Sequence, residues 1–270
     1  MTFAVVDMNG SDDAFEVIAP EFFNKRVCLY SVRRGSKEGS AQRLPEVVFS
    51  RVIDDDCGNA YGIGLMPSSG GASESEEEKN IIIDGGGTDK GSLGDAARPT
   101  FSHVIVSNHE RSEEDNTRES SNNNSISSTG GQLFSYSVPN GGNWKTSEWT
   151  RSTIESSIPV RSPVYSLNPG APGFPLVFKP DLEKEEWLIG LAGDGAEMAY
   201  VYRPVADNEG GVGLNYELMV SVAVGCTVGS LAVHHGEIFD GAKGKIRMAN
   251  LAVNCHERNM AFMISFDRGA

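Results

Sequence analysis

Oxygen-bearing side chains alternate in a short stretch near the start of the chain. Asp7, Asn9, Ser11 and Asp13 stand at every second position between two apolar runs. Oxygen ligands in this arrangement suit a hard cation such as Ca2+. The flanking runs have the composition of strands, and Asp12 stands where an EF-hand loop has glycine, so an EF-hand is excluded. A polar hairpin turn made of Asp, Asn and Gly is the other interpretation.

A second candidate site lies at the ends of two apolar segments. His109 and Glu110 end the segment "HVIVSNHE", and Asp194 lies near the end of "WLIGLAGDG". If these ends converge, they offer one imidazole and two carboxylates, a ligand set for Zn2+ or another divalent cation. The same residues can instead form a hydrogen-bonded polar rim. His234 and His235 mark a third such end, but neighbours on a strand point to opposite faces and cannot share one site.

Other patterns of reactive residues point to no chemistry. In "GGGTDKGS" Lys90 precedes the Gly-Ser pair, whereas a phosphate-binding loop needs Gly-Lys-Ser, and no helix pattern follows. There is no Gly-x-Ser-x-Gly motif, and no cysteine has an activating neighbourhood. Trp144, Trp149 and Trp187 fall in or beside strand candidates and are expected in the core. We predict neither a nucleotide site nor a nucleophilic enzyme.

Short apolar and aromatic runs must position these residues. They are separated by Gly, Pro, Asn and Asp, and no segment shows a capped helical period, which predicts an all-β chain. Residues 68–98 and 111–130 are rich in Ser, Asn, Gly and acidic residues. Such segments bury too little apolar area to order themselves, so we expect disordered insertions within a single domain spanning residues 1–270.

A repeated pattern of strands organises the all-β prediction. The segments "RVCLYSV", "GQLFSYSV" and "EMAYVYRP" share an apolar and aromatic alternation that ends near a Tyr. Each is preceded by a small apolar strand and followed by a further strand. A four-stranded unit repeated at intervals of tens of residues is typical of β-propeller blades.

Composition narrows the class of partner and the compartment. The formal net charge of −14 argues against nucleic acid, whose phosphates would be repelled. No apolar stretch is long enough to span a membrane, and the first residues lack the pattern of a signal peptide, which favours the cytoplasm. The four cysteines are scattered without a CxxC pair, so we expect structural thiols in a reducing compartment rather than disulfides.

The segments "VVDMNGSDDAFEVIAPEFF", "GQLFSYSVP" and "TVGSLAV" resemble the FG-GAP/VCBS repeat family of β-propellers, whose integrin-α-like members have seven blades. The resemblance covers most of residues 3–233 and implies a calcium loop after the first strand. Asp7 and Asn9 match its first two ligand positions, whereas Ser11 stands at the third and Asp12 replaces its glycine. Glu16 takes the place of its closing acid only with a one-residue insertion. Three to four blades are recognisable, so either an incomplete seven-bladed ring or a ring that closes with fewer blades is expected. Residues 236–270 diverge, and one hypothesis is that they close the ring by pairing with the first blade.

Two functions follow from this resemblance. The first is a non-catalytic binding module that presents a loop-lined face to a protein or carbohydrate ligand, with one calcium-stabilised loop. The alternative is a metal-dependent sugar lyase similar to the propeller part of aldos-2-ulose dehydratase, with a divalent cation held by His109, Glu110 and Asp194. Whether those three side chains converge distinguishes the two.

Overall fold

A computed structural model gives the arrangement of most of the chain. It describes residues 3–6, 14–33, 35, 37–38, 41–42, 44–68, 101–111, 130–139, 143–159, 170–205, 214–240 and 244–267. Both predicted disordered insertions fall almost entirely outside these ranges, as do Asp7, Asn9, Ser11 and Asp13.

Three antiparallel sheets have the same plan, in which four strands follow one another across the sheet. The first sheet contains β1 (Ala4–Val6), β2 (Ala14–Glu21), β3 (Arg26–Arg33) and β6 (Glu46–Asp54). The second contains β7 (Ala60–Pro67), β8 (Phe101–Asn108), β10 (Gly131–Ser137) and β11 (Thr150–Ile158). The third contains β13 (Pro175–Phe178), β14 (Leu188–Ala192), β15 (Met198–Pro204) and β16 (Tyr216–Ala223).

The last part of the chain forms a fourth sheet of three strands, β17 (Leu231–Asp240), β18 (Gly244–Cys255) and β19 (Met260–Ser265). The hypothesis that residues 236–270 pair with the first blade is therefore wrong. Their strands pair with one another, while β1 is hydrogen-bonded to β2 at the edge of the first sheet. Because these strands are long and joined by short turns, their backbone N–H and C=O groups can hydrogen-bond to one another.

Smaller elements lie between the strands of the four sheets. Two minimal strand pairs are β4 (Lys37–Glu38) with β5 (Ala41–Gln42), and β9 (Glu110–Arg111) with β12 (Gly170–Ala171). The helical content of the described residues is one short turn, η1 (Asn143–Lys145). No helix in the described ranges is long and apolar enough to cross a membrane.

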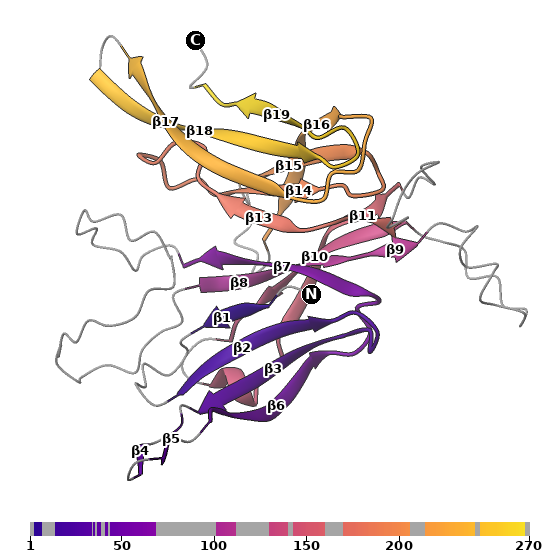
Figure 1. The fold of residues 1–270 in the computed structure, drawn as a ribbon, viewed down its shortest axis with the longest axis vertical. Coiled ribbons are helices and arrows are strands. Elements are labelled where there is room, and N and C mark those ends of the chain that lie inside the picture. Colours follow the sequence, from indigo (N-terminus) through magenta and orange to yellow (C-terminus); the bar gives the residue numbers. More distant parts are fainter. Residues whose placement is uncertain are drawn as a thin grey trace, which may run out of the picture.

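The four sheets stack in chain order along the longest axis of the molecule (Figure 1). The first and fourth sheets lie at opposite ends of this stack, with β13 of the third sheet next to β7 of the second. Each contact between sheets is face to face, so the side chains that alternate along a strand are shared between two neighbouring layers. The prediction of an all-β chain is confirmed.

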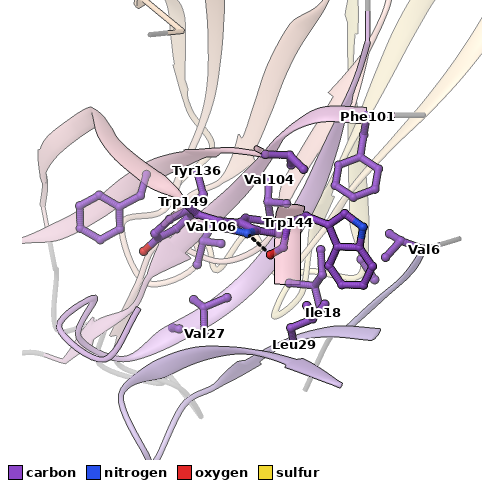
Figure 2. Packing of buried hydrophobic residues seen from close by; sticks show 14 of the residues in the cluster. Val6, Ile18, Val27, Leu29, Phe101, Val104, Val106, Tyr136, Trp144 and Trp149 are labelled. Carbon is purple, nitrogen blue, oxygen red and sulfur yellow. Dashed lines mark hydrogen bonds between the residues drawn. The ribbon is translucent and has the colours of Figure 1, made fainter. Parts of the chain in front are cut away.

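The largest core lies between the first and second sheets. Ile18 and Leu29 of the first sheet, Val104 and Tyr136 of the second, and Trp144 belong to this one core (Figure 2). The indole nitrogen of Trp149 donates a hydrogen bond of 2.9 Å to the Trp144 carbonyl oxygen. These two tryptophans are core residues, as their positions beside strand candidates predicted.

The cysteines differ from expectation. Cys226, before β17, and Cys255, at the end of β18, form a disulfide, while Cys28 and Cys57 are free and buried. The two bonded residues are 29 positions apart, and the hairpin of β17 and β18 brings them together. Sequence spacing did not reveal this proximity, and the cysteine content no longer argues for a reducing compartment.

Candidate functional site

The predicted calcium loop connects β1 to β2, two neighbouring strands of the first sheet. Asp7, Asn9, Ser11 and Asp13 lie outside the described residues, so their role as ligands stays a prediction. Glu16 is described. It lies opposite Val6 on β1 and is completely buried.

A cation already lies near the Glu16 carboxylate. Lys145 Nζ is 3.9 Å from Glu16 Oε1 and 4.7 Å from the centre of the Trp144 ring. An ammonium at this distance offsets part of the cost of burying the carboxylate. The burial of Glu16 therefore does not by itself require calcium.

His109 lies directly after β8 in a fully packed position. Its side chain is 1% exposed, and Nδ1 donates a hydrogen bond of 2.9 Å to the carbonyl oxygen of Pro172. This contact places the proton of a neutral imidazole on Nδ1 and makes Nε2 the acceptor. Nε2 lies against Gly170, where an added Cβ would come within 1.9 Å of it.

Aromatic rings enclose the imidazole. The Tyr61 ring lies 4.5 Å from it, centre to centre, and the Phe22 ring 5.8 Å. Tyr61 in turn stacks on Phe174 at 4.8 Å. Sequence spacing did not predict this enclosure, because the three aromatic residues come from the turn after β2, from β7 and from the segment before β13.

Asp194 approaches His109 from the third sheet. Its Oδ2 is 3.9 Å from His109 Nδ1, which is ion-pair range rather than hydrogen-bond distance. The residue is 4% exposed and has a φ of 47°. Its backbone forms a bridge with Val228, N to O at 3.0 Å, so Asp194 is fixed between the third sheet and the segment leading to the fourth.

Glu110 is held elsewhere. Its Oε1 accepts a long hydrogen bond of 3.4 Å from Asn108 Nδ2, which also donates to Gln132 Oε1 at 3.1 Å. The structure thus brings His109 and Asp194 together, while Glu110 contacts the amide network. Within the described ranges no three His, Cys, Asp or Glu side chains are grouped so that they could hold a metal ion.

The two adjacent histidines of β17 point to opposite faces, as predicted. His234 is exposed, whereas His235 Nε2 donates a hydrogen bond of 2.8 Å to the Lys179 carbonyl oxygen. His235 therefore fastens the fourth sheet to the segment after β13. Neither histidine lies at a site shared with the other.

Comparison of the chain with protein-family models, with characterised proteins and with solved structures finds no match.

Proposed function

We propose that the chain is a non-catalytic binding module of the β-propeller kind, related to FG-GAP/VCBS repeats, which presents a loop-lined face to a protein or carbohydrate ligand. Support for the architecture comes from three sheets with one strand plan and a fourth of three strands, stacked face to face. Blades of a propeller are likewise four-stranded antiparallel sheets. Fold alone does not distinguish binding from catalysis, so the candidate site must do so.

The packing of His109 is the observation that favours binding over catalysis. A catalytic or metal-binding imidazole needs an accessible nitrogen and partners aimed at a shared point. Here Nδ1 is used by Pro172, Nε2 abuts Gly170 and the ring is enclosed by aromatic residues. Asp194 adds one carboxylate next to an imidazole that is already hydrogen-bonded. This arrangement ties the second and third sheets together.

We further propose that a bound Ca2+ ion stabilises the hairpin between β1 and β2. Asp7, Asn9, Ser11 and Asp13 would supply oxygen ligands, and the bound ion would offset their mutual repulsion. Glu16, already near Lys145, would be a minor ligand or none.

Thermal unfolding with Ca2+, with Zn2+ and with chelator tests both the calcium loop and the choice between a binding module and an enzyme. We expect Ca2+ to raise the unfolding midpoint of the natural chain and to have no effect on the Asp7→Ala variant, because a ligand that binds the folded state stabilises it. Asp56→Ala is the matched control, since this exposed aspartate is not one of the predicted ligands and the variant should retain the shift.

The response to Zn2+ tests the alternative function. A Zn2+ stabilisation that His109→Gln abolishes would overturn the binding proposal in favour of the metal-dependent sugar lyase. No response to either ion would remove calcium from the proposal. The binding role would then be tested by screening immobilised glycans and peptides with the natural chain.

A further inference from the structure

The fourth sheet repeats the first three strands of the other sheets. In every sheet a residue with positive φ directly precedes the third strand, and these residues are Lys25 before β3, Gly130 before β10, Glu197 before β15 and Asn259 before β19. The strands β15 and β19 also begin alike, with Met-Ala-Tyr and Met-Ala-Phe. β19 is therefore the equivalent of β15, and among the described residues the fourth sheet has no equivalent of β16.

The burial of two side chains on β19 reflects the absent neighbour. Phe262 and Ile264 pack towards the third sheet, as their equivalents Tyr200 and Tyr202 pack towards the second. Tyr200 and Tyr202 are 6% and 1% exposed, whereas Phe262 and Ile264 are only partly buried. Both pairs have a preceding sheet beneath them. The difference lies beside them, because β16 flanks β15 and no described strand flanks the outer edge of β19.

The outer edge of β19 also lacks the residues that protect an exposed edge. Charged side chains and proline on an edge strand oppose pairing with another chain. The outer strands of the other sheets, β6, β11 and β16, each carry at least one charged side chain. β19 reads Met-Ala-Phe-Met-Ile-Ser and has neither a charge nor a proline. This composition is typical of a strand that is paired on both sides.

The backbone of β19 is oriented to accept a further strand. The Phe266 N–H donates a hydrogen bond of 3.2 Å to the Ala249 carbonyl oxygen on β18. Backbone groups alternate in direction along an antiparallel strand, so those of Ala261, Met263 and Ser265 point away from β18. These N–H and C=O groups are the template to which an extended peptide adds.

The surroundings of this edge define the side chains of the added strand. One face lies towards the third sheet, beside Phe262 and Ile264, and favours apolar residues. The other face is exposed, and there the Ser265 hydroxyl forms a hydrogen bond of 2.8 Å with Asn250. A strand between two such faces alternates apolar and polar residues. The consecutive isoleucines at 81–83, which lie outside the described residues, do not have this pattern.

A second folded sheet does not fit at the same edge. Val220 and Val222 of β16 belong to the same apolar clusters as Ile264 and Phe262. Equivalent strands of successive sheets stack on one another, as β13 does on β7 and β17, so β16 extends beneath the vacant position. A second copy that paired its own β19 here about a two-fold axis would bring its third sheet into the space of β16. A single extended segment brings no such sheet.

We propose that the outer edge of β19 binds an extended segment of a partner protein, which adds as an antiparallel fourth strand. The segment is as long as the six residues of β19 and has apolar side chains at alternate positions. Main-chain hydrogen bonds supply affinity and the alternate side chains supply specificity. This inference rests on the proposed binding function and narrows its ligand to a peptide.

Fluorescence anisotropy with a labelled peptide tests the proposal. The probe is the sequence of β6, residues 46–54, because this strand fills the fourth position of the first sheet and alternates suitably, with Val47 and Phe49 opposite Val32 and Tyr30. We expect the natural chain to bind this peptide, and the same peptide with Phe49→Pro to bind about 10-fold more weakly or less.

Variants of the chain locate the binding. Met263→Pro removes an N–H that points to the vacant edge and leaves the bonds to β18 intact, so the dissociation constant should rise about 10-fold or more. Met263→Ala keeps that N–H and should change it by less than about 3-fold. Ser221→Pro is the control on the outer edge of β16. Its N–H points away from β15, since Val224 N donates to Glu197 O, and binding should be unchanged. Circular dichroism and the unfolding midpoint verify folding of each variant.

Four results would overturn the proposal. One is a natural chain that does not bind the probe; if that chain binds an immobilised glycan, the proposed binding function stands without this inference. Another is equal binding by the natural chain and Met263→Pro. The third is binding that appears only in Ile82→Pro, which would assign the edge to residues 81–83 of the chain itself. The fourth is self-association that Met263→Pro abolishes, which would assign the edge to a second copy.

Discussion

The hydroxyl of Tyr136 on β10 donates a hydrogen bond of 2.8 Å to the Asp54 carboxylate at the end of β6, and so joins the second sheet to the first. Arg151 Nη1 donates to the same carboxylate oxygen, also at 2.8 Å. Burial, together with the nearby Cys57 and Asp54, raises the pKa of Tyr136, so its hydroxyl stays protonated and remains a donor. Stacked sheets are thus held by a polar contact at the margin of an apolar core.

Tyr136→Phe should destabilise the chain by about 1–2 kcal/mol, because a buried donor to a charged acceptor is lost while the ring is kept. Tyr202→Phe is the matched control. Tyr202 holds the corresponding place in the third sheet, but its hydroxyl has no hydrogen-bond partner among the residues that the structure describes. Its removal should be neutral or stabilising. Urea unfolding of both variants measures the difference, and equal effects would contradict the role given to Asp54.

The lowered pKa of Glu21 predicts that the free energy of unfolding depends on pH. Burial opposes its ionisation, but hydrogen bonds from Arg26, Tyr30 and Asn24 outweigh this and lower the pKa of Glu21 from 4.5 to about 2. A carboxyl whose pKa is lower in the folded state stabilises the fold above its unfolded pKa. That stabilisation is lost as the pH falls from about 4.5 towards 2.

Glu21→Gln should therefore lower the free energy of unfolding at neutral pH by up to about 3 kcal/mol, and the difference from the natural chain should shrink below pH 4.5. Urea unfolding across this pH range measures it. Glu46→Gln, which removes an exposed carboxylate 3.9 Å from Arg33, is the control and should change stability little. A difference for Glu21→Gln that is independent of pH would show that its carboxylate is not held as described.

The cysteines give a prediction about thiol content. The natural chain should show two thiols in denaturant and four after reduction. In the folded state Cys28 and Cys57 should react slowly, because burial raises the pKa of Cys28 to about 11 and that of Cys57 to about 12, and only a thiolate reacts.

Cys255→Ser should cost about 3.5 kcal/mol of stability, since closing a loop of 29 residues restricts the unfolded chain. Adding Cys226→Ser to the Cys255→Ser variant should lower the free energy of unfolding little further, because the first substitution has already removed the disulfide. Four reactive thiols in unreduced, denatured protein would contradict the pairing.

Alternation along the chain was enough to predict the strands. "RVCLYSV" became β3 with Val27 and Leu29 on one face and Tyr30 on the other, because a strand must separate its odd and even side chains. The all-β class followed, as did the core positions of Trp144 and Trp149.

Contacts between distant segments could not be predicted in this way. Strand pairing brings Cys226 to Cys255, and sheet stacking brings Asp194 to His109, neither of which is encoded in local spacing. Glu110 illustrates the converse case, in which neighbours in the sequence do not share a site. Its position next to His109 suggested a shared site, yet adjacent residues diverge, and its carboxylate meets Asn108 instead.

Gly170 tests whether His109 is as tightly enclosed as the structure shows. A methyl group there would lie 1.9 Å from His109 Nε2 and 2.7 Å from the Glu110 carbonyl oxygen, and both neighbours are held, by Pro172 and by the pairing of β9 with β12. Gly170→Ala should therefore cost about 2 kcal/mol or more through overpacking. At Gly229 an added methyl meets nothing within 4 Å, so Gly229→Ala should change stability by less than about 0.5 kcal/mol. If urea unfolding shows that Gly170→Ala is equally harmless, then space exists beside Nε2, the imidazole is available to a ligand, and His109 is not purely structural.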